Sequence, residues 1–351
     1  MAPKNSAEIF VDYPINAVEF IDNRTVLVCG GGGECRSGVP NKITAMRCSF
    51  KTTDKKKRLQ KFREVILPPK EDCPLAIAAA RLPGAGGLDF TVLVGCNQSQ
   101  ELRKIDVNRN VRKYSYLRDH HFAFHDAVQF DPHIRPQIDD PKHLQLTPDA
   151  SVAVMMTTAM PSEIVVFEPA TLECTNRICP DLPFEIVDIH LCAATNGSTL
   201  TYITASSVTT VNTAFGDVVH PTSATAAKTL AKYYLSKVRC VSSTKVLLAA
   251  SLRSRKGAAL LEYDLQTGRV TKERLLSKTS RAVVLEYCES RGLVAVALND
   301  CSVALIRAHD FKVLKTYKKL HNFAITSLSF CPNGSKLASG SAAQTVNVLL
   351  L

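Results

Sequence analysis

Short apolar runs bounded by Gly, Pro, Asn, Asp and Ser recur along the chain, and almost no segment keeps a helical period. The runs begin near residues 18, 89, 151, 198, 245, 292 and 336, and two of them read "DFTVLVGCNQS" and "GLVAVALNDCSVALI". A spacing of roughly 40–70 residues is the period of a propeller whose blades are four-stranded antiparallel sheets. The pattern therefore predicts an all-β chain with seven blades in a single domain over residues 1–351. A two-layer β-sandwich is the alternative, but it does not explain units that repeat in kind.

The last unit, "LHNFAITSLSFCPNGSKLASGSAAQTVNVLL", resembles a WD-repeat blade. His321 stands where that family has its Gly-His pair, whereas Ala343 and Leu349 replace the usual Asp and Trp. The buried polar network of such blades is thus incomplete, and we expect the blades to rest mainly on apolar packing. The chain stops near the third strand of this unit, so we expect the ring to be closed by the N-terminal segment Ala7–Tyr13.

Composition places few further limits on the chain. Apolar residues make up 46% of the 351 residues, enough for a packed core, and no apolar run approaches the ~18–20 residues that span a bilayer. Twelve cysteines are scattered without a C-x-x-C pair, so neither a zinc site nor a compact disulfide framework is predicted. The N-terminus lacks the apolar core of a secretory signal, which indicates reduced thiols in the cytosol.

The net charge of +11 is concentrated in two segments. Lys228–Arg281 holds thirteen Lys and Arg against three acids, and Lys51–Arg63 holds seven against one. Such an excess suits nucleic acid, an anionic membrane or an acidic protein partner, although solvated strand and loop faces are the simpler interpretation. The Lys51–Arg63 segment also fits the weak pattern of a nuclear localisation signal.

A histidine cluster lies in "RDHHFAFHDAVQFDPH", where His121 and His125 have the i, i+4 spacing of metal ligands on a helix. The Pro and Asp content of the cluster, which also holds His120 and His133, predicts a loop between blades, so a metal site is not favoured. Ser/His/Asp and Cys/His arrangements have no recognisable local signature, and a hydrolase or cysteine protease is therefore unsupported.

The stretch "GGGGECRSGVPNK", Gly30–Lys42, follows an apolar run and precedes another. Gly33 to Gly38 has the spacing of a P-loop, but Val39, Pro40 and Asn41 occupy the positions that need Lys and Ser/Thr. The segment "NKITAMRCSF" that follows predicts a strand, whereas a P-loop must open a helix. A phosphate-binding loop is therefore excluded, and a long hairpin loop is the simple interpretation.

The segment "YPINAVEFIDNRTVLVCGGGGECRSGVPNK", Tyr13–Lys42, resembles the start of a particular propeller family. This is the family of endoplasmic-reticulum guanine-nucleotide exchange factors that initiate COPII coat assembly, the prolactin regulatory element-binding protein family. Further matches are Leu93–Gln98, Ala295–Ile306 and His321–Val346, whereas the middle of the chain, Arg109–Lys232, matches loosely.

The resemblance implies a propeller on the cytosolic face of the endoplasmic reticulum membrane, joined to a C-terminal anchor that this chain lacks; we therefore expect the chain to be a fragment. It also implies that the loop is ordered by potassium, held by backbone carbonyls within Gly30 to Asn41, and engages a small Ras-related GTPase of the COPII pathway. Asn41 is our candidate for the acting residue because its amide both donates and accepts hydrogen bonds. Pro40 would hold Asn41 extended and Val39 would add apolar contact. The loop scaffold would be Gly30, Gly31, Gly32, Gly33, Glu34, Gly38 and Lys42, with the role of Glu34 left open between repelling phosphates and capping the loop.

Three functions remain open from the sequence. The resemblance favours nucleotide exchange on a GTPase, which requires no covalent chemistry. A non-catalytic propeller scaffold is the alternative, since a fold alone does not specify a function. DNA binding rests on charge alone, so no specific nucleic acid is expected.

Overall fold

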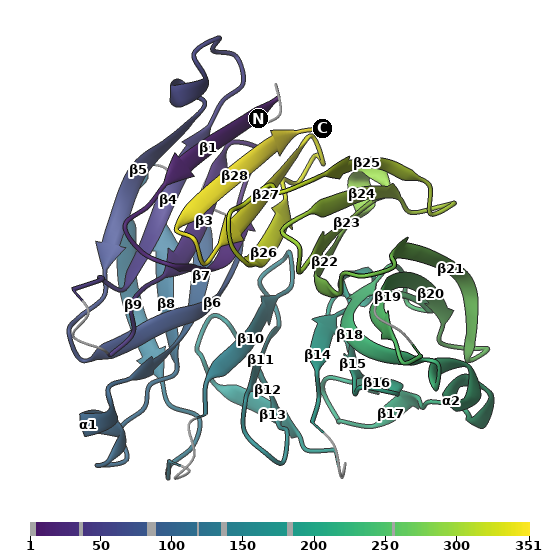
Figure 1. Cartoon of the computed structure of the whole chain (residues 1–351). Coiled ribbons are helices and arrows are strands. Elements are labelled where there is room, and N and C mark those ends of the chain that lie inside the picture. Colours follow the sequence, from purple (N-terminus) through teal and green to yellow (C-terminus); the bar gives the residue numbers. More distant parts are fainter. Residues whose placement is uncertain are drawn as a thin grey trace. The chain divides into compact units, whose positions relative to one another are not determined.

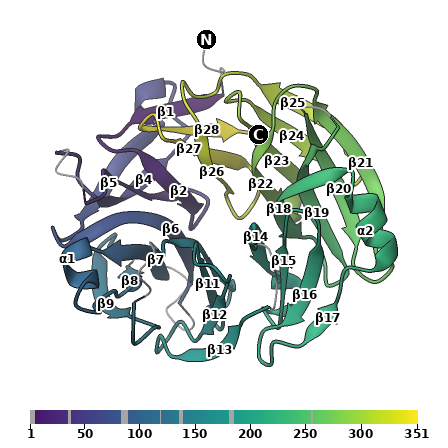
Figure 2. The same cartoon turned by 60° about the horizontal axis from the view of Figure 1, so that its bottom comes forward.

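A computed structural model of the chain describes residues 5–34, 38–82, 89–117, 119–134, 139–180, 185–254 and 257–351. Within these residues the strands form seven four-stranded sheets, which are the blades of a seven-bladed β-propeller (Figures 1 and 2). The predicted fold class is thus confirmed. Across the described ranges, no helix has the length and apolar character needed to cross a membrane.

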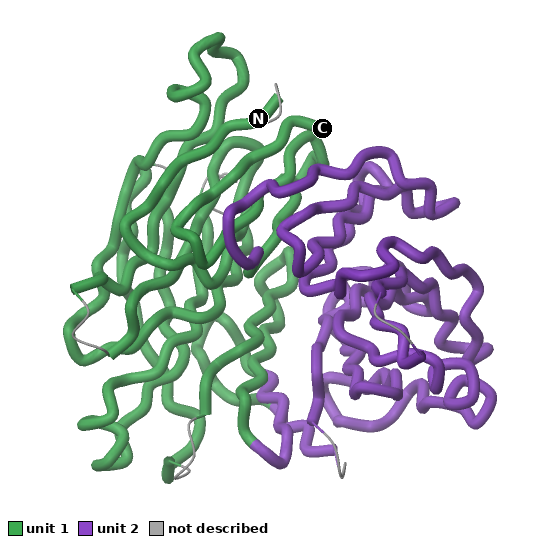
Figure 3. Tube along the Cα trace, in the orientation of Figure 1, with its two compact units in different colours: residues 1–159, 167–175, 326–351 green, residues 160–166, 176–325 purple. Residues whose placement is uncertain are grey.

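The chain divides into two compact units (Figure 3). The first unit comprises residues 1–159, 167–175 and 326–351, and the second comprises residues 160–166 and 176–325. The candidate loop Gly30–Lys42 belongs to the first unit.

Three sheets and most of a fourth belong to the first unit. Their strands are β1 (Ser6–Phe10), β2 (Ile15–Phe20), β3 (Thr25–Gly30), β4 (Lys42–Cys48), β5 (Leu59–Ile66), β6 (Glu71–Arg81), β7 (Phe90–Gln98), β8 (Val111–Tyr116), β9 (Phe122–Val128), β10 (Pro141–Leu146), β11 (Ala153–Thr157), β12 (Ile164–Phe167), β13 (Cys174–Ile178), β26 (Ile325–Phe330), β27 (Lys336–Ser341) and β28 (Thr345–Leu350). The short helices here are η1 (Lys55–Lys57) and α1 (Gln100–Arg103). Strands β12 and β13 complete the sheet of β10 and β11 and cross the boundary between the units.

The second unit holds three sheets. Their strands are β14 (Asp188–Leu191), β15 (Thr199–Ile203), β16 (Val208–Asn212), β17 (Val218–His220), β18 (Tyr233–Cys240), β19 (Lys245–Leu252), β20 (Ala258–Asp264), β21 (Arg269–Ser277), β22 (Ala282–Cys288), β23 (Leu293–Leu298), β24 (Val303–Arg307) and β25 (Val313–Tyr317). The helices are η2 (Ala193–Thr195), α2 (Ala224–Leu230) and η3 (Glu289–Arg291).

Every apolar run detected in the sequence contains an inner strand of its blade, namely β3, β7, β11, β15, β19, β23 and β27. An inner strand is hydrogen-bonded on both edges and most of its residues are buried, so its sequence is largely apolar. All six residues of β3 are buried, for example. Outer strands such as β5 are mostly exposed and therefore do not appear as apolar runs in the sequence.

The N-terminal strand closes the last blade, as predicted. Strand β1 pairs antiparallel with β28, with Ser6 opposite Leu349 and Phe10 opposite Thr345. The sheet order β1-β28-β27-β26 therefore joins the two ends of the chain in one blade (Figure 2).

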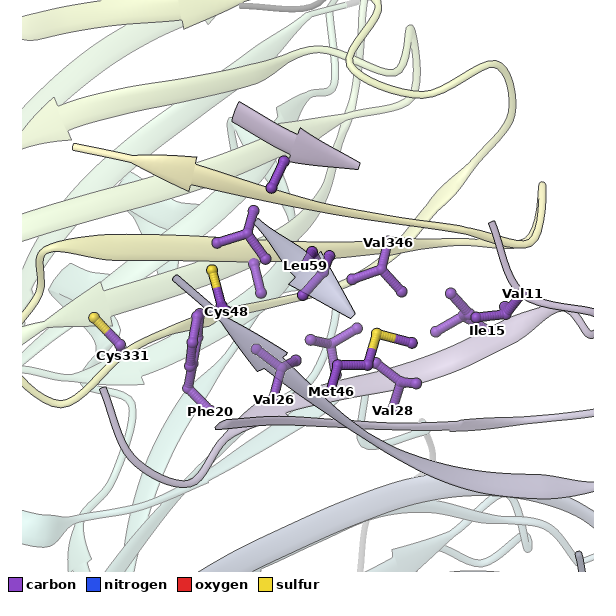
Figure 4. Packing of buried hydrophobic residues seen from close by; sticks show 14 of the residues in the cluster. Val11, Ile15, Phe20, Val26, Val28, Met46, Cys48, Leu59, Cys331 and Val346 are labelled. Carbon is purple, nitrogen blue, oxygen red and sulfur yellow. The ribbon is translucent and has the colours of Figure 1, made fainter. Parts of the chain in front are cut away.

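Apolar packing fills the space between this blade and the next. Side chains from β2, β3 and β4 meet those of β28 in a buried cluster that includes Phe20, Val26, Met46 and Val346 (Figure 4). Strand β27 approaches β2 so closely that a Cβ on Gly340 would lie 2.6 Å from the Val18 side chain. A glycine is therefore required there, and the apolar contacts replace the incomplete polar network of the WD blade.

The histidine cluster departs in part from its prediction, because residues 122–128 form strand β9, whereas His120, His121 and His133 lie outside this strand. Cross-strand pairing with β8 decides the conformation of this segment, and local Pro and Asp content does not reveal such pairing. The His120 Nδ1 atom lies 2.9 Å from the Tyr116 hydroxyl, and His125 Nε2 lies 2.8 Å from Ser115 Oγ. Within the described ranges, no three His, Cys, Asp or Glu side chains form a group that could hold a metal ion.

Candidate functional site

The glycine-rich stretch connects β3 to β4 and is bounded by the opposed pair Gly30 and Lys42. A strand follows it, as predicted, so the helix that a P-loop must open is not there. A Cβ on Gly30 would lie 1.9 Å from the carbonyl oxygen of Pro14, and Gly33 has φ +75°. Glycine is therefore needed at both positions. Gly38 also has a positive φ, and Cys35, Arg36 and Ser37 lie outside the described residues.

Asn41 lies at the base of the loop and is only partly exposed. Its Oδ1 accepts a hydrogen bond from the Gly33 amide at 2.9 Å, and its Nδ2 donates to the Gly33 carbonyl at 3.3 Å. Nδ2 also donates to the carbonyl of Glu71 at 3.0 Å. The side chain that the sequence offers as the acting residue thus holds the two arms of its own loop together and ties them to β6.

Glu34 anchors the other side of the loop. Its Oε2 accepts a hydrogen bond from the Gln100 amide at 2.8 Å, and its Oε1 lies 3.0 Å from an Arg103 guanidinium nitrogen. Both partners belong to α1, the short helix after β7. In this structure Glu34 therefore fastens the loop to its neighbouring blade, which favours the anchoring role over repulsion of phosphates.

Lys42 is buried where the loop rejoins the sheet. Its Nζ lies 2.7 Å from Asp12 Oδ2 and 3.6 Å from Glu64 Oε2. Burial alone would lower the pKa of Lys42, but these two carboxylates outweigh it and raise that pKa above its ordinary value. Lys42 therefore stays charged and holds the end of the loop where it rejoins β4.

Val39 and Pro40 are both partly exposed. Val39 packs against the apolar cluster formed by β2, β4 and β28, so part of its side chain contacts its own blade. The remaining exposed surface of these two residues, next to the exposed Gly38, is what the described part of the loop offers to a partner.

Asn16 of β2 and Cys73 of β6 hold the loop through a further set of hydrogen bonds. Asn16 Nδ2 donates to Cys73 Sγ at 2.9 Å, and Cys73 Sγ in turn donates to the Gly31 carbonyl at 3.4 Å. Burial raises the pKa of the Cys73 thiol to about 12, so it stays protonated and keeps this bond. Next to it, the Glu71 carboxylate lies 2.7 Å from Nε of the fully buried Arg112.

These supporting residues were not predicted from the sequence. Asp12, Cys73 and Arg103 lie outside the motifs found in the sequence, and Asn16 lies within Tyr13–Lys42 without any pattern that marks it as a partner of the loop. Only the pairing of blades brings them to the loop, so a single sequence carries no signal for them.

The donor atoms around the loop suit an alkali cation. They are oxygens: the carbonyls of Gly31 and Gly33, Oδ1 of Asn41, and Oδ1 of Asp72, which lies 3.0 Å from where a Cβ of Gly33 would be. Each carbonyl has two lone pairs, so the hydrogen bonds already made leave one free. Carbonyl oxygens are the ligands that potassium takes in selective sites, and the residues present therefore fit the ion that the resemblance implies.

The two basic segments lie away from the loop in sequence. Lys51–Arg63 covers η1 and most of the exposed strand β5. Lys228–Arg281 covers the second unit's sheet β18–β21, where Lys245 and Lys272 lie 3.8 and 2.9 Å from the buried Glu262. Part of that excess is therefore neutralised inside the sheet.

Comparison with known proteins agrees with this architecture. Residues 285–350 match the WD40 domain of anaphase-promoting complex subunit 4. The chain is 30% identical over 99% of its length to the putative guanine nucleotide-exchange factor SED4 of Saccharomyces cerevisiae. It is 29% and 26% identical, over 97% of its length in each case, to the guanine nucleotide-exchange factor SEC12 and the putative factor SED4 of Candida glabrata.

The matches cover unequal parts of these relatives. The chain spans about a third of the two SED4 proteins, 31% and 32%, and 71% of the SEC12 protein. The fold defines the class, which is the seven-bladed β-propellers, and residues 285–350 match a WD40 domain. Within that class the chain is a homologue of the SEC12 and SED4 proteins over nearly its whole length, which confirms the resemblance found in the sequence.

Proposed function

We propose that this chain is a guanine-nucleotide exchange factor, and that the Gly30–Lys42 loop is the element that acts on a small Ras-related GTPase. The observation that carries the proposal is the similarity over 97–99% of the chain to proteins named as exchange factors. The loop supports it, because its base is held by Asn41, Glu34 and Lys42 while Gly38 is exposed.

Exchange requires no covalent step. A factor that binds the nucleotide-free GTPase more tightly than the loaded one weakens nucleotide binding by the same ratio. Each tenfold loosening needs about 1.4 kcal/mol of differential binding. A loop whose shape is fixed before binding spends little of that energy on ordering itself, which is what the internal hydrogen bonds of this loop achieve.

Within this proposal the residues divide by role. Val39 and Pro40 supply contact with the GTPase, and Asn41 keeps them in position through Gly33 and Glu71. Asn41 could also exchange its internal bonds for bonds to the switch region during the reaction. Potassium, held by the oxygens around Gly31, Gly33 and Asn41, would add a positive charge that draws the loop carbonyls together.

The finer parts of the proposal concern place and partner. The GTPase is the Ras-related protein that recruits the COPII coat, and the chain works at the cytosolic face of the endoplasmic reticulum membrane, held by an anchor outside this sequence. Both follow from the resemblance of Tyr13–Lys42 to the exchange-factor family.

A nucleotide-release assay tests the proposal. The COPII GTPase is loaded with a fluorescent GDP analogue, and release into excess GTP is followed with and without this chain. We expect the chain to accelerate release, and we expect a Ras-related GTPase of another pathway to be unaffected. Unchanged release at micromolar concentrations of the chain would refute the exchange function and leave the propeller as a scaffold.

A further inference from the structure

Exposed cations gather at one rim of the second unit, where the chain passes from sheet β18–β21 to sheet β22–β25. Strand β21, the last of its sheet, ends at Ser277, and β22, the first of the next sheet, begins at Ala282, so the four residues between them connect the two sheets at this rim. Lys278 and Arg281 lie in this connection and are exposed.

The register of the strands brings further cations to the same rim. Arg253 follows the end of β19, and its amide donates to the carbonyl of Lys232, just before β18. In the next sheet, Lys318 and Lys319 follow the end of β25, and the amide of Leu320 donates to Cys301 in the β23–β24 turn. The side chains of all these cations are exposed. We call this set the basic rim, and it consists of Lys232, Arg253, Lys278, Arg281, Lys318 and Lys319.

Negative charge is scarce there. In the described segments 231–234, 252–254, 257–258, 277–281, 298–302 and 317–320, Asp300 is the one acidic residue. Its carboxylate accepts hydrogen bonds from the hydroxyls of Ser280, at 2.9 Å, and Ser302, at 2.5 Å. The rim therefore presents a concentrated positive charge, unlike the middle of the same sheet, where Glu262 neutralises Lys245 and Lys272.

Two aromatic side chains accompany these cations. Tyr234 is 49% exposed, and the Arg253 guanidinium lies 4.0 Å from the centre of its ring. Phe323, shortly after Lys319, is 63% exposed. Exposed Tyr and Phe next to Lys and Arg are typical of surfaces that sit in the headgroup layer of a bilayer. The guanidinium covers one face of Tyr234, which leaves only the other face for a stacking base.

We propose that the basic rim docks on an anionic phospholipid membrane. Phosphate and carboxylate headgroups attract each nearby Lys or Arg, and the attraction adds up over the cations at the rim. Phe323 would enter the layer between the headgroups. The proposal concerns the second unit alone and does not depend on nucleotide exchange.

Vesicle sedimentation tests this inference. The purified chain is mixed with vesicles of 70% phosphatidylcholine and 30% phosphatidylserine, or of phosphatidylcholine alone, at low salt. We expect binding to the anionic vesicles only, and a steep loss of binding near 0.5 M salt because exposed charges are screened. No sedimentation with anionic vesicles at low salt would overturn the proposal.

A matched pair of variants distinguishes an effect of the basic rim from an effect of the net charge of the whole chain. The rim variant carries Lys278→Glu, Arg281→Glu and Lys318→Glu, and the control carries Lys55→Glu, Lys56→Glu and Lys57→Glu in the exposed helix η1, so both change charge equally. We expect at least about a tenfold loss of vesicle affinity in the rim variant, and less than about twofold in the control. Equal losses would overturn the proposal, because they would show that only net charge matters.

Two further measurements complete the test. A second rim variant with Lys278→Gln, Arg281→Gln and Lys318→Gln should melt at the wild-type temperature and lose vesicle binding to a similar extent. This result would exclude misfolding as the cause of the loss. Duplex DNA at equal phosphate concentration should compete weakly. If DNA binds the wild type more tightly than the vesicles do, and the rim variant loses that binding, the rim is a nucleic-acid surface and the membrane proposal falls.

Discussion

The side-chain amide of Asn41 bonds to the backbone of Gly33 through both its oxygen and its nitrogen, which closes the base of the β3–β4 loop on itself. Since the same nitrogen also reaches the carbonyl of Glu71, one side chain joins the two arms of the loop to the next blade. The position of Val39 and Pro40 therefore depends on the side-chain amide of Asn41, which the sequence suggested as the group that acts on the GTPase.

Replacement of Asn41 by Ala removes these bonds. Because the amide is partly buried and its partners lose their hydrogen bonds, we expect a loss of about 1–2 kcal/mol in the free energy of unfolding. Nucleotide release should fall by at least about tenfold, since the loop no longer holds its shape. Denaturant melts and the fluorescent release assay measure the two effects.

Two companion variants sharpen this test. Asn41→Asp keeps the acceptor for the Gly33 amide but cannot donate to Glu71, so its exchange rate should lie between those of wild type and Asn41→Ala. The exposed Asn322→Ala should change neither quantity. A normal exchange rate for Asn41→Ala would show that the loop is not the acting element, and the basic segment Lys228–Arg281 would then be the first surface to examine.

The contact between Glu34 and Arg103 makes a prediction that separates two roles for Glu34. If Glu34 anchors the loop to α1, Arg103→Ala should slow nucleotide release by about threefold, and the swap Glu34→Arg with Arg103→Glu should restore part of the rate. If Glu34 instead repels phosphates, Arg103→Ala would leave release unchanged and the swap would abolish it. Release rates of the wild type, Arg103→Ala and the swap distinguish these outcomes.

The isolated chain should bind neither GTP nor GDP. Its glycine stretch leads into strand β4, and Pro40 has no amide hydrogen to offer a phosphate oxygen. Titration calorimetry of the chain with each nucleotide should give no measurable heat of binding. A micromolar dissociation constant would contradict our interpretation of the loop.

The pair of Asp12 and Lys42 predicts how stability depends on pH. The hydrogen bond from Lys42 holds the pKa of Asp12 below its ordinary value of 3.8. The folded state therefore favours the carboxylate, so the stability due to this pair is present above about pH 4 and is lost as the pH falls through the lower, folded-state pKa. The melting temperature of the wild type should exceed that of Asp12→Asn at pH 6, and the difference should shrink below pH 4. A difference that stays constant down to pH 2 would rule out this linkage.

Potassium provides a further prediction. If the oxygens around Gly31 and Gly33 hold this ion, replacing potassium by sodium at constant ionic strength should slow exchange, because the smaller cation fits the same carbonyls poorly. Limited proteolysis of the loop should also become faster in sodium, which is a readout independent of exchange. Identical digestion and exchange rates in the two salts would argue against an ion in the loop.

The sequence reveals inner strands better than it reveals contacts between blades. Runs such as Thr25–Gly30 are apolar because both of their faces are covered, so they could be located without a structure. Strand β9 was missed because it is partly exposed, interrupted by His125 and Asp126, and held by pairing with β8.

The candidate loop shows the same limit. The position of the loop and its glycines could be found in the sequence. The partners of Asn41, Glu34 and Lys42, however, come from β6, α1 and the segment between β1 and β2. Those contacts depend on how the blades meet, which one sequence does not express.

The pairing of β1 with β28 also sets the order in which this protein can be completed. During synthesis β1 emerges long before its partner β28 has been made. Blades such as β2–β5 and β6–β9 can form from strands made one after another, whereas β1 cannot pair with the blade of β26, β27 and β28 until β28 has left the ribosome. Until then β1 presents an unpaired edge that a chaperone would have to shield from other nascent chains.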